Sequence, residues 1–181
     1  LEFRRVLFRS FVNDAHESAA LDRIAERWAG EWTSGSATLS PTMGEYERTS
    51  TAVVNAALAP RIVAYLSRLD EELRSLGLRH PMLLVQSNGG AISVQQVAPR
   101  PVNLLLSGPA AAVGALNHYR RFLDPAMPGE EGNLISMEIG GTSCDVLLMS
   151  GGEVAAKDAL SIAGYDVSTP AIDIHTIGAG G

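Results

Sequence analysis

The chain has 181 residues, of which 46% are hydrophobic, and its formal net charge at pH 7 is −6. This length and composition suffice for one sizeable core and predict about one domain. We expect neither nucleic acid nor a membrane as a partner, because the acidic chain has no basic stripe and no apolar run near the ~18 residues of a membrane span. The single cysteine excludes an internal disulfide and fits a reducing cytoplasm.

The two ends of the chain are unusual. Residues 1–10, LEFRRVLFRS, lack an initiating Met, and their apolar run is too short for a signal peptide. We expect them to be a non-native tail, with a native amphipathic turn as the alternative. The last residue, Gly181, stands inside a glycine-rich turn that normally leads into another element. Both ends therefore predict that the sequence is a fragment.

Helical patterns dominate the first half. Residues 14–29 place apolar side chains on one stripe with charges opposite, which predicts an amphipathic helix. A second helical pattern runs from about Tyr46 to Leu76. Pro60 lies inside it and predicts a break or kink near Ala59, and Gly77 provides the stop.

Strands and helices alternate in the rest of the chain. The pattern predicts, in order, a strand at 82–86, a turn at 87–90, a strand at 91–93, a helical turn at 94–98, a helix from Ser107 as cap to Phe122, a strand hairpin at 134–149, and strands at 154–159 and 170–177. This alternation predicts an α/β fold.

The predicted hairpin carries the chemistry. Its turn reads Gly140, Gly141, Thr142 and Ser143, and Asp145 follows in the second strand. Glycines expose backbone N–H groups to a phosphate with no Cβ in the way, and hydroxyls add further donors. A carboxylate suits hydrated Mg²⁺. The pattern is compatible with a phosphate and magnesium site, and equally with an ordinary hairpin whose glycines only make the turn.

Five segments extend this pattern into a family resemblance. They are YERTSTAVVNAALAP (46–60), LLVQSNGG (83–90), RPVNLLLSGPAAAVGA (100–115), EIGGTSCDV (138–146) and DIHTIGAGG (173–181). In order and spacing they resemble the hydantoinase A / 5-oxoprolinase / acetone carboxylase β-subunit family, and the region from the first to the last, 46–181, spans about three quarters of the chain.

The resemblance implies an actin-like ATPase (ribonuclease H-like) fold, here incomplete. Residues 11–118 would be the end of its first lobe, and 119–181 the start of its second. It implies ATP and Mg²⁺ as cofactors and a small cyclic amide, a hydantoin or lactam, as substrate. ATP would phosphorylate the amide oxygen before ring opening, with a hydantoinase B-type subunit or domain as partner. The alternatives are an acetone carboxylase-like ligase and a nucleotide-binding module without catalysis.

The resemblance also implies roles for residues outside the turn. Glu138 stands where the family usually has Asp, so we expect it beside Asp145 at the metal, with altered geometry. Ser107 and Gly108 would face the nucleotide cleft. Gln86, Ser87 and Asn88 end a strand, where ligand clefts form in α/β sheets, and would line the substrate cleft; a plain hairpin turn is the alternative.

Four further residues have competing interpretations. Asp173 and His175 are two apart on a predicted strand and so share a face, where they would shuttle a proton, bind metal or form a structural pair. Cys144 is expected to be a small buried hydrophobe rather than a reactive thiol. By physics alone Arg48 is expected to be solvated at the start of its helix.

Overall fold

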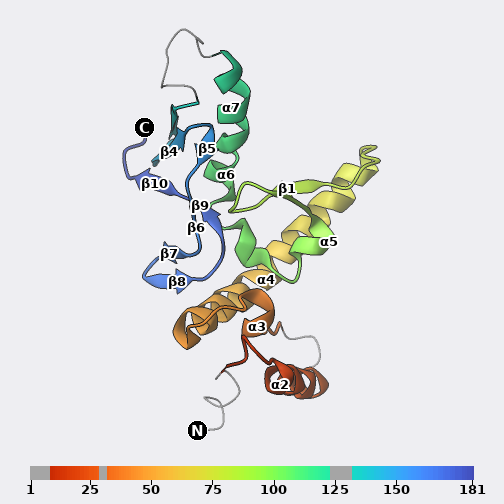
Figure 1. The fold of residues 1–181 in the computed structure, drawn as a ribbon. Coiled ribbons are helices and arrows are strands. Elements are labelled where there is room, and N and C mark those ends of the chain that lie inside the picture. The colour runs from red at the N-terminus through yellow and green to blue at the C-terminus, as the bar shows by residue number, and fades with distance from the viewer. Residues whose placement is uncertain (1–8, 29–31, 123–131) are drawn as a thin grey trace. The chain divides into compact units, whose positions relative to one another are not determined.

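The computed structural model describes residues 9–28, 32–122 and 132–181 (Figure 1). Contacts divide the chain into two compact units whose segments interleave. The first unit runs to Leu84 and includes Ile92–Asn103 and Ala159–Thr169. The second comprises Val85–Ala91, Leu104–Asp158 and Pro170–Gly181. The boundary expected near residue 118 divides the two lobes of the implied actin-like ATPase fold, which are not these two contact units, so it stays a prediction.

The first unit is mainly helical. Its helices are α2 (Ala15–Arg27), α3 (Ser36–Leu39), α4 (Glu45–Ser75) and α5 (Val94–Val97), followed by a 3₁₀ turn, η1 (Pro101–Leu104). Two short strands, β7 (Leu160–Ile162) and β8 (Tyr165–Val167), pair antiparallel. Within the described residues, no helix has the length and hydropathy that crossing a membrane requires.

Helix α2 forms where the sequence predicts it, but with a different side chain buried. Glu17 is 6% exposed, whereas Ala15 and Trp28, two apolar residues of the stripe predicted within 14–29, are exposed. The Glu17 carboxylate accepts hydrogen bonds from the backbone N–H groups of Ser36 and Ala37 at the start of α3. An acidic side chain there satisfies N–H groups that lack partners within the helix, so Glu17 caps α3 across a loop.

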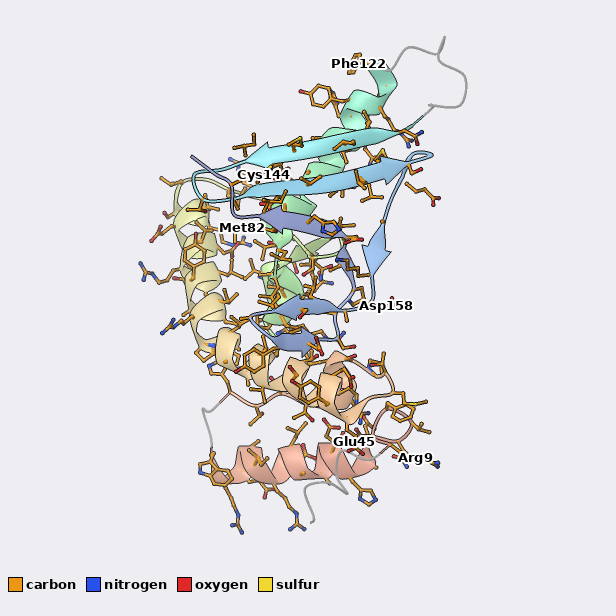
Figure 2. The ribbon with its side chains drawn as sticks, turned by 90° about the vertical axis from the view of Figure 1, so that its left-hand side faces the viewer. Arg9, Glu45, Met82, Phe122, Cys144 and Asp158 are labelled. Carbon is orange, nitrogen blue, oxygen red and sulfur yellow. The ribbon has the colours of Figure 1, made fainter. Side chains whose placement is uncertain are left out.

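Helix α4 continues through Pro60 without a break. Proline removes one backbone hydrogen bond and crowds the preceding turn, which bends a helix that packing holds together. Figure 2 shows that the ribbon of α4 changes direction partway along. The helix ends as predicted, with Gly77 at a φ of +102° and its N–H bonded to the Arg74 carbonyl.

Polar side chains of α4 are buried, which the sequence did not indicate. Arg48 is fully buried, with its guanidinium 5.3 Å from the centre of the Phe11 ring, so the prediction of a solvated Arg48 is wrong. Asn55 donates to the Pro99 carbonyl at 3.1 Å and accepts from the Val102 N–H at 3.1 Å. Such bonds offset the cost of burying polar atoms and fix α4 against the η1 segment.

The second unit is an antiparallel sheet with a helix on one face. The sheet order is β10 (Ile174–Ile177), β4 (Cys144–Ser150), β3 (Leu134–Ile139), and β5 (Glu153–Val154) also pairs with β4. Helices α6 (Ser107–Ala110) and α7 (Ala112–Tyr119) lead into the 3₁₀ turn η2 (Arg120–Phe122). The core joins helix to strands and consists of Ala110, Ala112, Leu116, Leu147, Met149 and Ile172.

Several expected elements are shorter in the structure than in the prediction. The helix expected over 107–122 is interrupted at Ala111, and Leu106 precedes it at a φ of +57°, so Ser107 begins the helix and is not its cap. The strand expected at 154–159 divides at Ala155 into β5 and β6 (Ala156–Lys157). The one at 170–177 divides at Asp173 into β9 (Ala171–Ile172) and β10, and β6 pairs with β9. Strands β7 and β8 were not predicted.

A short hairpin formed by β1 (Leu83–Val85) and β2 (Ala91–Ser93) follows α4, as predicted. The Gln86 N–H donates to the Gly90 carbonyl at 2.8 Å, and Gly89 adopts a φ of +79°. Ser93 and Gln96 then form a capping box that starts α5. Residues 1–8, in the proposed tail, lie outside the described residues.

Candidate phosphate and metal site

The hairpin formed by β3 and β4 confirms the predicted strand-turn-strand. Its register pairs Glu138 with Asp145 and Ile139 with Cys144, leaving Gly140–Ser143 as the turn. The Gly140 N–H donates to the Ser143 carbonyl at 2.8 Å and closes the turn. Gly140, Gly141 and Thr142 are exposed, so this backbone is open to a ligand.

The two glycines of this turn are not explained by local backbone needs. Neither has a positive φ, the conformation for which glycine is usually required. A Cβ at Gly141 would meet no atom within 4 Å, and one at Gly140 would meet only the Ser143 carbonyl oxygen, at 3.7 Å. Glycine here leaves a smooth, uncovered backbone that another molecule can approach closely.

Three polar side chains form a row on one face of the sheet. Residues paired across antiparallel strands point to the same face, and the register aligns Glu138 with Asp145 and Asp145 with Thr176. Leu147, on the same face two residues further along β4, is buried in the core with Leu116 of α7. The row therefore lies on the helix-covered face, at the end nearest the turn.

Two carboxylates directly opposite each other repel, which destabilises the strand pair unless a cation lies between them. The described residues contain no group of three or more His, Cys, Asp or Glu side chains able to hold a metal ion. Mg²⁺ needs only one or two carboxylates when phosphate oxygens and water complete its shell. The donor set of Glu138 and Asp145 therefore fits a magnesium ion that arrives with a phosphate ligand.

A second glycine turn, at 178–181, lies against the first. The Gly181 N–H donates to the Gly140 carbonyl at 3.2 Å. A Cβ on Gly180 would lie 2.5 Å from the backbone N of both Thr142 and Ser143, so only glycine allows this approach. Thr176, just before this turn, donates its hydroxyl to Asp145 Oδ1 at 2.6 Å. Sequence reasoning gave Thr176 and Gly180 no role, although both lie in DIHTIGAGG.

The proposed substrate residues form the tip of the β1–β2 hairpin. Asn88 Oδ1 accepts a hydrogen bond from the Gly90 N–H at 2.9 Å, which is a turn-forming role. Ser87 is 1% exposed, and its carbonyl accepts from the Ile172 N–H at 2.8 Å. Gln86 is partly exposed. The geometry thus accounts for Ser87 and Asn88 as structural residues, and their substrate role stays a prediction.

Ser107 and Gly108 begin α6, in the same unit as the hairpin turn. Gly108 is exposed, and a Cβ added there would meet nothing within 4 Å. Ser107 is partly exposed. This segment is therefore open to a ligand, but within the described part of the chain no backbone hydrogen bond joins it to the Gly140–Ser143 turn.

Asp173 and His175 are not on one strand, because Asp173 occupies the break between β9 and β10. The Asp173 carboxylate forms an ion pair with Lys157 Nζ, and its backbone N–H donates to the Ala155 carbonyl at 2.8 Å. His175 is exposed and pairs in register with Val146. Asp173 thus joins β10 to the β6 segment. Cys144 is buried, at 5% exposure, as expected for a small hydrophobe.

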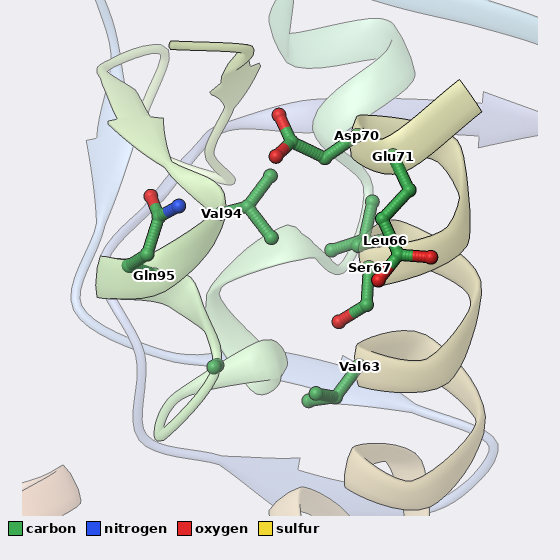
Figure 3. Close-up of a pocket in the computed structure, with 8 residues that line it drawn as sticks. Val63, Leu66, Ser67, Asp70, Glu71, Val94 and Gln95 are labelled. Carbon is green, nitrogen blue, oxygen red and sulfur yellow. The ribbon is translucent and has the colours of Figure 1, made fainter. Parts of the chain in front are cut away.

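A separate cavity lies in the first unit, between α4 and α5, with a volume of about 280 Å³ (Figure 3). Val63, Leu66 and Val94 give it an apolar lining, and Asp70 and Glu71 add carboxylates. Asp70 forms an ion pair with Arg74, whose Nε lies 2.7 Å from Asp70 Oδ2. None of the residues singled out from the sequence lines this cavity, whereas all of them except Arg48 belong to the second unit.

Comparisons with known proteins place the chain among relatives of known activity. The profile of the family described as Hydantoinase/oxoprolinase matches residues 48–181. Caprolactamase subunit alpha of Pseudomonas jessenii is 34% identical over 95% of this chain and 24% of its own length. For 5-oxoprolinase 1 of Arabidopsis thaliana the identity is 31% over 97% of this chain and 13% of the relative. Acetone carboxylase beta subunit of Xanthobacter autotrophicus is 25% identical over 96% of this chain and 24% of its own length.

The crystal structure of the ATP-dependent caprolactamase from Pseudomonas jessenii superimposes with a TM-score of 0.78 at 34% identity, covering 95% of this chain and 24% of that chain. The described residues therefore adopt a fold found in that enzyme. The chain spans about a quarter or less of the length of these relatives.

Proposed function

The chain belongs to the Hydantoinase/oxoprolinase family, and from this we propose that it is part of an ATP-dependent enzyme that opens a cyclic amide. Its second unit would hold the phosphates of Mg·ATP at the Gly140–Ser143 turn. The observation that carries this proposal is the uncovered Gly-Gly backbone beside two facing carboxylates, Glu138 and Asp145. That combination suits an anionic ligand accompanied by a divalent cation.

Each residue of the turn has a distinct role in this proposal. The Gly141 N–H would bind a phosphate oxygen, and Gly140, whose own N–H closes the turn, would leave the backbone uncovered. The hydroxyls of Thr142 and Ser143 would add donors. Asp145 and Glu138 hold the hydrated cation, with Glu138 reaching one methylene further than an aspartate would. Bound Mg·ATP would supply a phosphoryl group to the amide oxygen of a lactam or hydantoin, which would activate the carbonyl carbon for attack by water.

We propose that residues 119–181 are the start of the second lobe of an actin-like ATPase fold. In such a fold, phosphoryl transfer depends on positioning and charge neutralisation from both sides of the nucleotide. The resemblance implies that an earlier, similar Gly-Gly-Thr hairpin binds the nucleotide from the other side. The 181 residues contain the Gly-Gly-Thr sequence only at 140–142. We therefore expect this chain alone to bind Mg·ATP without hydrolysing it at a useful rate.

The resemblance to the family also suggests roles for residues outside the turn. Ser107 and Gly108 would approach the nucleotide, and Gln86, Ser87 and Asn88 the cyclic amide. His175, exposed on β10, is the candidate for proton transfer, while Asp173, paired with Lys157, orients the strand. Because two of the relatives are subunits of larger enzymes, we propose a hydantoinase B-type subunit or domain as partner.

An acetone carboxylase-like ligase is the second candidate, favoured by the similarity to that enzyme's beta subunit. The third is a nucleotide-binding module without catalysis, favoured by Glu138 in place of the family's usual aspartate. ATP turnover by a longer protein containing this chain separates the three. Lactam-stimulated turnover supports the amidohydrolase, turnover with a ketone and bicarbonate supports the ligase, and Mg·ATP binding without turnover supports the module.

Calorimetric titration of this chain with ATP, in the presence of Mg²⁺ or of EDTA, tests the proposed site. We expect binding that requires Mg²⁺ and that weakens at least about tenfold, or about 1.4 kcal/mol, in Asp145→Asn. Asp158→Asn is the matched control, because Asp158 is an exposed acidic residue outside the site. The absence of Mg²⁺-dependent binding to the folded wild-type chain would contradict the proposal.

A further inference from the structure

We infer that the phosphate and metal site is a composite of two turns, in which Thr176 positions Asp145 and the 178–181 turn completes the surface made by Gly140–Ser143. This inference rests on the proposed function and adds to it a positioning residue and a second turn that supports the phosphate turn. Neither Thr176 nor Gly180 stands out by chemistry in the sequence. Both are brought to the site by the pairing of β10 with β4.

Thr176 controls the direction of a carboxylate. It pairs in register with Asp145, and its hydroxyl donates to Asp145 Oδ1 at 2.6 Å. A carboxylate held by one oxygen no longer rotates freely about its last bond. Among the described residues, none donates a hydrogen bond to Asp145 Oδ2, which stays available to a cation. Thr176 therefore fixes the metal-binding oxygen without touching the metal.

The 178–181 turn is held against the phosphate turn by backbone contacts. Gly181 N–H bonds to the Gly140 carbonyl, and Gly180 lies so near the Thr142–Ser143 peptide that a Cβ would collide with it. By contrast, Gly178 is exposed, and a Cβ added to it would meet nothing within 4 Å. Gly180 and Gly181 thus make the contact between the turns, and Gly178 leaves its backbone open.

The composite gives each turn a separate task. The first turn offers backbone N–H groups and hydroxyls to phosphate. The second turn restrains the backbone of the first by the contacts described above. A phosphate bound at Gly141 is therefore expected to perturb the second turn as well, because the two backbones are bonded. A phosphate turn without contact to residues 178–181 would transmit nothing to them.

The test uses the 181-residue chain with ¹⁵N-labelled glycine, the isosteric variant Thr176→Val and the conservative variant Thr176→Ser. Titration with Mg·ATP is followed by NMR at the glycine amides, and affinity is measured by calorimetry with Mg²⁺ and with EDTA. We expect Gly140, Gly141, Gly178 and Gly180 to shift together in the wild-type chain. Thr176→Val should lose about tenfold in the Mg²⁺-dependent gain of affinity, with metal-free ATP binding changed less than about twofold, and Thr176→Ser should keep the gain.

The possible outcomes distinguish failure of the composite-site inference from failure of the proposed function. No Mg·ATP binding by the wild-type chain overturns both. Wild-type binding that Thr176→Val leaves intact, or shifts confined to Gly140 and Gly141, overturns the composite site and leaves the proposed function standing. A loss in Thr176→Val that is equal with and without Mg²⁺ also overturns the positioning role, because a merely structural change does not discriminate between metal-bound and metal-free ATP.

Discussion

Strand β4 has a Gly-Gly turn at each end, and the two turns differ in why they contain glycine. At the far end, Gly151 and Gly152 have φ values of +58° and +83° and join β4 to β5 in a two-residue hairpin. At the near end, Gly140 and Gly141 have no positive φ and no crowding neighbour. The first pair is required by the fold, and the second is required by nothing within the described fold.

This difference separates a structural glycine from a ligand-facing one. A two-residue loop with positive φ at both positions is the preferred connection of twisted antiparallel strands, and glycine adopts it without strain. An exposed glycine pair in an ordinary conformation lacks that explanation. Close approach by a ligand supplies one, which is why we assign phosphate binding to Gly140–Ser143 rather than to Gly151-Gly152.

The largest expected effect is on stability, at the far turn. Replacing both Gly151 and Gly152 by alanine forces two side-chain-bearing residues into the left-handed region, at about 1–2 kcal/mol each. We expect the free energy of unfolding to fall by about 2–4 kcal/mol in urea titrations followed by circular dichroism. The matched control, Gly140→Ala with Gly141→Ala, should change it by less than about 1 kcal/mol. Equal losses in the two double variants would remove the distinction between the turns.

The second effect is on binding, at the near turn. Gly141→Ala places a methyl group on the backbone that we assign to phosphate, and we expect Mg·ATP affinity to fall about tenfold, near 1.4 kcal/mol, with stability nearly unchanged. Gly114→Ala is the control, because Gly114 also has open space around it but lies in α7 outside the site. It should bind normally and be slightly more stable, since alanine favours helices. Calorimetry that shows unchanged affinity in Gly141→Ala would rule out close approach at this residue.

The sequence predicts a hairpin turn at both places, although only the near turn is followed by two hydroxyl residues and an aspartate. Gly-Gly next to an apolar run signals a hairpin in both places, and the strands at 134–139 and 144–150 form as expected. Backbone φ values and the space around each Cα arise only in the folded chain. At the near turn the local pattern left a ligand site and an ordinary hairpin equally open, and the family resemblance, carried by EIGGTSCDV, favoured the ligand site.

Long-range partners account for most of what the sequence did not predict. The burial of Arg48 depends on Phe11, and that of Asn55 on Pro99 and Val102, residues distant in the chain. Likewise, Asp173 interrupts a predicted strand because Lys157 and the Ala155 carbonyl engage it from another segment. Hydrophobic periodicity reports on neighbours in sequence and carries no information about such contacts.

The smallest expected effect concerns the side chain that holds the far turn in place. Asn133 Oδ1 accepts the Gly151 N–H at 2.9 Å, so Asn133 holds the far turn as Thr176 holds the near site. Asn133→Ala removes one exposed hydrogen bond, and we expect a stability loss of about 1 kcal/mol with unchanged Mg·ATP affinity. Asn133→Asp keeps the acceptor and should recover most of the stability. Weaker nucleotide binding in Asn133→Ala would mean that strain passes along β4 from one turn to the other, and the two turns would then act as one coupled device.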